Sequence, residues 1–186
     1  MRKGGIRFQY NAPVVLSFAL ASLCALGLDY LTMGWTTVKI FSVYHSAASD
    51  LLTYPRFFLH VLGHSGYEHY LGNMMMILVI GPGLEERYGS KNLLLAIVLT
   101  AAVSGMVHWL FFPGGLMGAS GIVFMMIVMA SLAGMKSGYV PLTLVLVLVL
   151  YIGGEVMDGF TLHDSVSQLS HIVGGICGAM LGLIMR

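Results

Sequence analysis

The sequence is organised around the stretch Gly118-Ala119-Ser120-Gly121, in which a serine stands between small residues. This stretch opens an apolar run that continues without a charged residue to Ala130. The run is apolar enough to lie in a lipid bilayer. Small residues at such a position let two membrane helices pack closely. The nucleophile elbow of soluble hydrolases reads G-x-S-x-G, but Ile122 stands where its last glycine belongs. The stretch is therefore either a helix-packing contact or the start of a membrane helix that carries a reactive serine.

Composition indicates a membrane protein. Hydrophobic residues make up 58% of the 186 residues, charged residues only 9%, and the mean hydropathy is +0.87. A soluble domain carries about 25% charged residues, so we expect an all-α polytopic membrane protein. The length allows one domain, residues 1–186, and the net charge of +1 gives no indication of a nucleic acid partner. Cys24 and Cys177 lie in apolar segments, which indicates packing rather than a disulfide.

Six apolar segments are each long enough to cross a hydrocarbon core of about 30 Å. The first, residues 13–31, has no convincing cleavage site, so we interpret it as a membrane span and not as a signal peptide. A long loop, residues 32–67, follows it. We expect the remaining spans at residues 68–84, 92–112, 120–135, 140–156 and 167–185, connected by short loops.

The basic residues set the orientation. Seven of the nine fall on one side of a six-span chain, and only Lys39 and Arg56 fall on the other. Positive charge collects on the cytoplasmic side of membrane proteins. The pattern therefore predicts an integral protein of the cell (inner) membrane with both termini in the cytoplasm, including the short segment 1–12.

Three polar side chains lie at one depth in this arrangement. Ser120, His69 and His171 each come 15 or 16 residues before the charged residue that marks the inner end of their span. At 1.5 Å per residue, all three lie about 22–24 Å above the inner boundary. Ionisable residues inside a membrane are costly and usually face protein or water. We therefore predict a site that opens to the outer side; the alternative is a set of polar groups that only connect helices.

The second span has two hydrogen-bond donors on one face, because His69 and Asn73 are four residues apart. Both side chains can point a donor at the same place. His60, His64 and Glu68 lie nearby, so a zinc site is an alternative. The H-E-x-x-H motif is absent, however, and H-x-x-E-H is missed by one residue. We therefore expect no metal.

The sixth span carries glycines every four residues, at Gly174, Gly178 and Gly182. Such a ladder is a surface for close helix contact. It serves either packing alone or the placement of His171 against the helix that carries Ser120. A serine needs a base within about 2.6–3.2 Å to become a nucleophile.

These motifs together resemble the rhomboid family of intramembrane serine proteases, in its minimal six-helix form. The resemblance covers about residues 55–182 and rests on the order of several motifs. They are His64-x4-His69-x3-Asn73, Gly118-Ala119-Ser120-Gly121 and Ser170-His171-x2-Gly174-x3-Gly178, with Arg56-Phe57-Phe58-x-His60 and Gly83-Leu84-Glu85-x-Arg87-Tyr88-Gly89 on either side of the second span.

The resemblance implies a role for each matching residue. Ser120 would be the nucleophile and His171 its general base, without an acid partner. His69, Asn73 and the backbone amide of Ser120 would form the oxyanion hole. The remaining motif residues would support the site, with His64 structural at the top of the second span; they are Gly118, Gly121, Phe124, His64 and Gly174.

Phe124 is a departure from the family, which often has tyrosine four residues after the serine. Its ring face remains available beneath the imidazole of His171, although the hydroxyl is lost. The expected reaction needs no metal and no cofactor. The expected partners are transmembrane protein substrates within the lipid bilayer.

The fifth span, residues 140–156, is rich in Leu and Val and lacks a glycine ladder, so we expect it to pack less tightly and to admit substrate from the side. Gly153-Gly154 would be its hinge, and Met157 and Phe160 would cap the cavity. The alternative is an ordinary helix that faces lipid.

Two other function classes stay open. One is a catalytically inactive relative that binds membrane proteins, but such relatives typically lose the serine or the histidine. The other is a small transporter, for which paired acidic residues at mid-membrane are expected. Glu155, Asp158 and Asp164 lie at the outer end instead.

Overall fold

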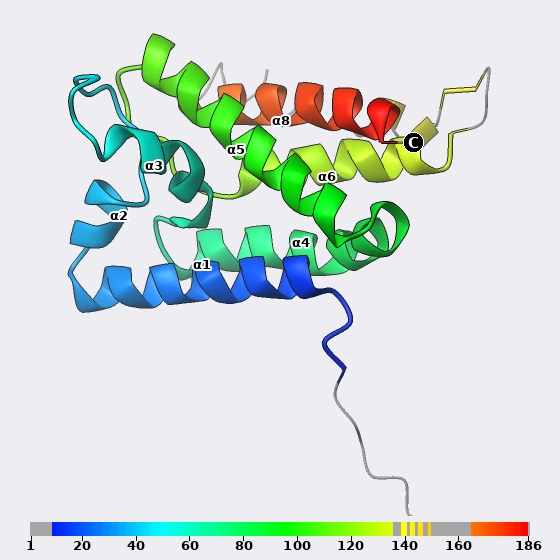
Figure 1. The fold of residues 1–186 in the computed structure, drawn as a ribbon, viewed down its shortest axis with the longest axis horizontal. Coiled ribbons are helices and arrows are strands. Elements are labelled where there is room, and N and C mark those ends of the chain that lie inside the picture. Colours follow the sequence, from blue (N-terminus) through cyan, green and yellow to red (C-terminus); the bar gives the residue numbers. More distant parts are fainter. Residues whose placement is uncertain are drawn as a thin grey trace, which may run out of the picture.

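A computed structural model describes residues 9–135, 139–140, 142–143, 145–146, 149 and 165–185. Every regular element with bounds in these ranges is a helix, and together they form a bundle (Figure 1). Five helices are long and three helical segments are short. The long ones are α1 (Pro13–Leu31), α4 (Tyr67–Tyr88), α5 (Ser90–Phe111), α6 (Ser120–Ala133) and α8 (Ser165–Ile184), and the short ones are α2 (Trp35–Lys39), α3 (Thr53–Leu59) and the 3₁₀ turn η1 (His60–Leu62).

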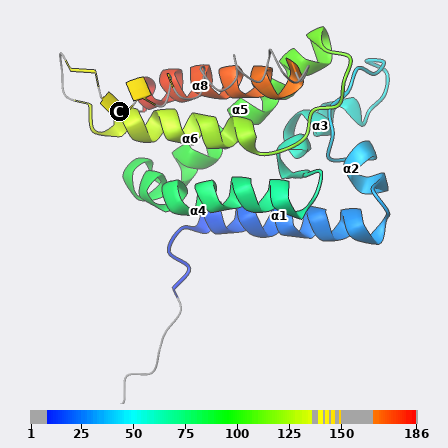
Figure 2. The same ribbon diagram turned by 180° about the vertical axis from the view of Figure 1, so that it is seen from behind.

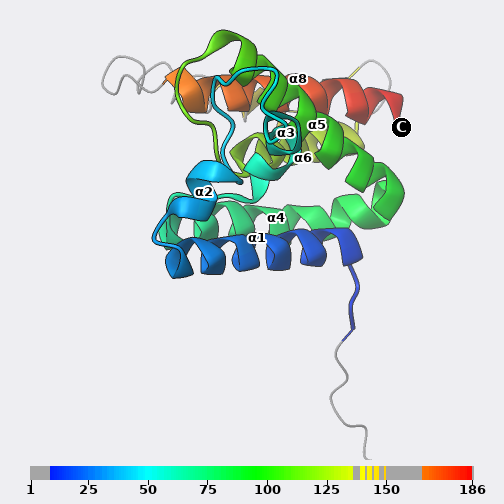
Figure 3. The same cartoon turned by 60° about the vertical axis from the view of Figure 1, so that its left-hand side comes forward.

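The bundle has two helix pairs. α1 lies along α4, and α6 lies along α8, with α4 packed against α6 (Figures 1 and 2). α5 runs obliquely across and contacts α8 and α3, as the view in Figure 3 shows from another side. This arrangement places α6, the serine helix, between α4 and α8.

The expected spans 13–31, 68–84, 92–112, 120–135 and 167–185 each correspond to one long helix, with ends that differ by up to four residues. Two of these helices, Pro13–Leu31 and Ser90–Phe111, are long and apolar enough to cross a membrane, whereas Ser120–Ala133 and Leu169–Ile184 are apolar but shorter. The predicted fifth span, residues 140–156, falls mostly outside the described residues, as do its hinge and cap residues. The count of six spans thus remains a prediction.

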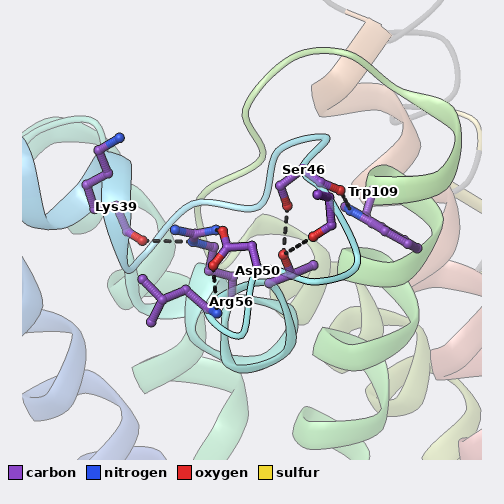
Figure 4. Close-up of polar contacts among 8 residues, drawn as sticks. Lys39, Ser46, Asp50, Arg56 and Trp109 are labelled. Carbon is purple, nitrogen blue, oxygen red and sulfur yellow. Dashed lines mark hydrogen bonds and ion pairs between the residues drawn. The ribbon is translucent and has the colours of Figure 1, made fainter.

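The segment 32–67 is not the plain loop that the sequence predicts, because α2, α3 and η1 lie within it. Helices this short are marginal in isolation, and side chains from elsewhere hold them. The buried Arg56 of α3 donates from Nε to the Lys39 carbonyl at 2.7 Å and pairs with Asp50 at 2.9 Å (Figure 4). Trp109 of α5 donates from Nε1 to the Ser46 carbonyl at 3.0 Å. The segment 32–67 is therefore held by hydrogen bonds within it and by one hydrogen bond to α5.

α4 continues past the predicted end of the second span at residue 84 and reaches Tyr88. Glu85 thus lies inside the helix, and its buried carboxylate accepts from the backbone N–H groups of Val14 at 2.9 Å and Val15 at 3.0 Å. Ser90 also donates its hydroxyl to Glu85, at 2.7 Å. The first N–H groups of a helix have no intrahelical partner, so Glu85 caps α1 from 70 residues away.

The closest helix contact joins α6 to α8 through the predicted glycine ladder. A Cβ built on Gly174 would overlap the carbonyl oxygen of Gly121, and one on Gly178 would lie 2.5 Å from the carbonyl oxygen of Met125. Gly182 is looser, because the nearest atom to its Cβ, in Leu132, would be 3.3 Å away. The ladder thus brings the two backbones together most tightly at the end that carries Ser120 and His171.

Candidate active site

Ser120 is the first residue of α6, and the loop before it is held by backbone hydrogen bonds. Leu116 exchanges two of them with Val43, at 2.9 and 2.8 Å. Gly118 donates its N–H to the carbonyl of His60 at 3.0 Å. Hydrogen bonds to residues of the segment 32–67 therefore fix the position of the loop that leads into α6.

His60, whose carbonyl accepts from Gly118, is itself bound to α5. Its side chain is buried, and Nε2 donates to the carbonyl of Ala101 in α5 at 3.1 Å. Burial lowers the pKa of His60 to about 4, so the ring is neutral at physiological pH. A neutral ring with one proton on Nε2 fits an acceptor carbonyl. His60 thus joins α5 to the loop that precedes the serine.

His69 and Asn73 of α4 converge on Gly118, two residues before the serine. A Cβ built on Gly118 would lie 2.7 Å from Cε1 and 2.8 Å from Nε2 of His69, and 3.9 Å from Nδ2 of Asn73. Gly118 also has φ of +116°, a conformation that residues with a Cβ rarely adopt. The sequence prediction that the two donors share one face is confirmed, and Gly118 is required for their approach.

The hydrogen bonds of His69 decide which nitrogen carries its proton. Nδ1 faces Ser65, whose backbone N–H donates to it at 3.5 Å and whose Oγ lies 3.1 Å away. A ring nitrogen that accepts an N–H carries no proton. With Nδ1 as the acceptor, the neutral ring would carry its proton on Nε2, the atom near Gly118. Asn73 is buried, and its Nδ2 has no hydrogen-bond partner among the described residues.

α8 meets the serine from the other side. Oγ of Ser120 lies 3.3 Å from Oγ of Ser170, and the imidazole of His171 stacks on Phe124 with ring centroids 4.7 Å apart and planes 18° apart. Phe124 is one turn after Ser120 on the same helix. The predicted ring contact is confirmed, and it places His171 on the face of α6 from which Ser120 projects.

His64 supports the α4 side of the site, just before that helix begins. Its ring is buried and lies edge-on to the rings of His69, at 5.0 Å, and Tyr70, at 5.6 Å. Burial, and to a lesser degree the neighbouring His69, lowers the pKa of His64 to about 4. Within the part of the chain that the structure describes, no three His, Cys, Asp or Glu side chains form a group that could hold a metal ion. The ring of His64 thus packs against that of His69.

The site thus has a hydroxyl in the middle, an imidazole on one side and N–H donors on the other. Sequence reasoning found these groups but gave no role to two serines that contact them, Ser65 and Ser170. A signal existed for both. Ser65 precedes His69 by four residues, and Ser170 directly precedes His171.

Comparisons with known proteins identify relatives of this chain. The family model described as the rhomboid domain matches residues 52–186. Similar curated proteins include those named Rhomboid protease GlpG from Salmonella paratyphi A, Salmonella newport and Salmonella typhi. Each is 29% identical over 133 residues, which cover 69% of this chain and 48% of the relative. The chain therefore spans about half the length of the curated relatives it matches.

Proposed function

The chain belongs to the rhomboid family, and from that premise we propose that it is an intramembrane serine protease that cleaves transmembrane segments of other membrane proteins. The relatives it resembles are named as proteases. The chain carries both residues that a serine–histidine dyad requires, and they are on the two most closely packed helices.

In the proposed reaction, Oγ of Ser120 attacks the carbonyl carbon of the scissile peptide bond, and His171 takes the serine proton. The same proton then passes to the nitrogen of the leaving amine as the C–N bond breaks. Water, deprotonated by His171, hydrolyses the acyl-enzyme and releases Ser120. Serine is a weak nucleophile without such a base, so the two residues act as one unit. Phe124 orients the imidazole, a task that an acid residue performs in a triad.

The oxyanion would be stabilised from the α4 side. Nε2–H of His69 and Nδ2–H of Asn73 are both directed toward the loop at Gly118. The amide of Ser120 is in the first turn of α6, where N–H groups have no intrahelical acceptor, and the positive end of the helix dipole favours a negative charge there. Each preorganised donor is worth about 2.7–4 kcal/mol in a soluble serine protease.

The membrane arrangement that suits this chemistry has six spans in the cell (inner) membrane, both termini in the cytoplasm and the site opening to the outer side. Water can then reach Ser120, while substrate enters from the bilayer beside the fifth span, residues 140–156. A disulfide engineered between the second and fifth spans should block cleavage of a transmembrane substrate reversibly. Unimpaired cleavage with the crosslink verified would exclude this entry route.

One observation carries the proposal: α8 places Ser170 against Ser120 and His171 on Phe124 at once. This pairing favours a working dyad over an inactive relative that only binds membrane proteins. No feature of the described residues favours a transporter.

The test uses the purified chain in detergent with a transmembrane reporter substrate. The wild type should cleave the reporter, and Ser120→Ala should not. An activity-based fluorophosphonate should label Ser120, and His171→Ala should abolish labelling without unfolding the protein. Equal labelling of wild type and His171→Ala would refute the dyad.

A further inference from the structure

Ser170 of α8 contacts the proposed nucleophile through its side chain. Its Oγ is 3.3 Å from Oγ of Ser120, and the residue is only 5% exposed. Its carbonyl oxygen would be 3.0 Å from a Cβ built on Gly121, the residue after the nucleophile. The contact is therefore a buried one between two backbones that approach closely.

The position of Ser170 is fixed by the glycine ladder. Ser170 and Gly174 are four residues apart and share a face of α8, and Gly174 packs against the carbonyl of Gly121. Gly174 and Gly121 therefore bring the backbones of α8 and α6 together one turn from Ser170. This approach lets the hydroxyl of Ser170 lie beside that of Ser120.

We propose that Ser170 is a positioning residue for the nucleophile. Its hydroxyl holds Oγ of Ser120 in the rotamer that faces α8, the helix that carries His171. A serine side chain has three staggered rotamers, and only those directed toward α8 bring its proton near the imidazole. This role rests on the proposed protease function and extends it to a residue beside the dyad.

A buried serine between two membrane helices has a simpler use, which is to connect them. The two roles differ in what the loss of the hydroxyl changes. A helix contact contributes to stability, whereas a positioning contact changes the rate at which Ser120 reacts. The O–O distance is longer than the usual 2.7–2.8 Å of such bonds, so the effect on the rate should be moderate.

The experiment measures labelling of the full chain in detergent by an alkyl fluorophosphonate. The probe forms an O–P bond to Ser120 and loses fluoride, while the serine proton passes to His171. For Ser170→Ala we expect the maximal labelling rate to fall about 2- to 10-fold, as the loss of one hydrogen bond predicts. The probe concentration at half-maximal rate and the thermal unfolding midpoint should stay within error.

Two further variants make the result specific. Ser170→Thr returns a hydroxyl at the same place and should recover most of the rate. Ser22→Ala removes another fully buried hydroxyl, on α1, and should leave the rate unchanged.

Several outcomes would overturn the proposal. One is an unchanged or faster labelling rate in Ser170→Ala. Another is a loss of labelling rate in Ser170→Ala that comes with a lower unfolding midpoint and is not recovered in Ser170→Thr. If the wild type itself is neither labelled nor active on the reporter, the protease function fails and the positioning role fails with it. If the wild type reacts and only the Ser170 results disagree, the protease function stands.

Discussion

Because His171 stacks on Phe124, we predict that a substitution of Phe124 can lower activity without lowering the stability of the fold. Replacing Phe124 by leucine keeps a bulky apolar side chain in a buried position but removes the flat surface beneath the imidazole. The rings are 4.7 Å apart and nearly parallel, so the whole of the aromatic contact would be lost. Such contacts are worth about 0.5–1.5 kcal/mol beyond burial.

If the lost energy falls entirely on the transition state, it corresponds to a decrease in kcat of about 2- to 13-fold. KM should change less, because Phe124 lies beneath the base and not at the surface that receives substrate. Phe124→Tyr retains the ring and should keep near-normal kcat; it also restores the residue that the family often has at this position.

The assay is cleavage of a transmembrane reporter in detergent, with kcat and KM determined for the three proteins. Thermal unfolding of each serves as the control for folding. Wild-type kcat in Phe124→Leu, together with an unchanged unfolding midpoint, would refute the role of the stack. His171 would then be oriented by other contacts.

Three further predictions follow from the contacts around this pair. If Asn73 is an oxyanion donor that acts mainly in the transition state, as proposed, Asn73→Ala should lower kcat by roughly 10- to 1000-fold with a smaller change in KM; equal turnover would remove Asn73 from the site. Gly174→Ala should lower the unfolding midpoint clearly, because its Cβ would overlap the α6 backbone, whereas the matched Gly175→Ala should not, because nothing lies within 4 Å of a Cβ there. Acidification should also destabilise the protein between pH 6.5 and about 4, because the folded pKa of His64 is lowered from 6.5 to about 4 and only the unfolded chain takes up the proton in that window. His64→Gln should show a weaker loss of unfolding midpoint over the same pH range, and an identical loss would contradict this assignment.

The sequence predicted those parts of the molecule that depend on local periodicity. The positions of the long helices followed from hydropathy to within four residues at each end, and the shared face of His69 and Asn73 followed from their spacing of four. Glycines at intervals of four predicted that α8 makes a close helix contact, and α6 as its partner was one of the two alternatives that the sequence left open.

Contacts between distant residues could not be predicted in the same way. The cap that Glu85 provides for α1 joins residues about 70 positions apart. The sequence shows only a lone glutamate at the end of an apolar segment, and nothing in that pattern indicates whether it caps another helix. α2 and α3 are five and seven residues long, so their own periodicity is too short to detect. They form because Arg56 and Trp109 bind carbonyl groups in the same segment.

The structure also explains why the second glycine of the serine motif stands one position earlier than in a soluble elbow, at Gly121 and not at position 122. Gly118 faces α4, where a side chain would displace the ring of His69, and Gly121 faces α8, where one would meet the carbonyl of Ser170. Each glycine thus admits one of the two helices that carry the proposed chemistry, and Ser120 stands between them. The residue after Gly121 faces the buried core instead, so Ile122 is accommodated there, fully buried at 1% exposure. The departure from G-x-S-x-G is therefore explained by a serine that helices approach on both sides.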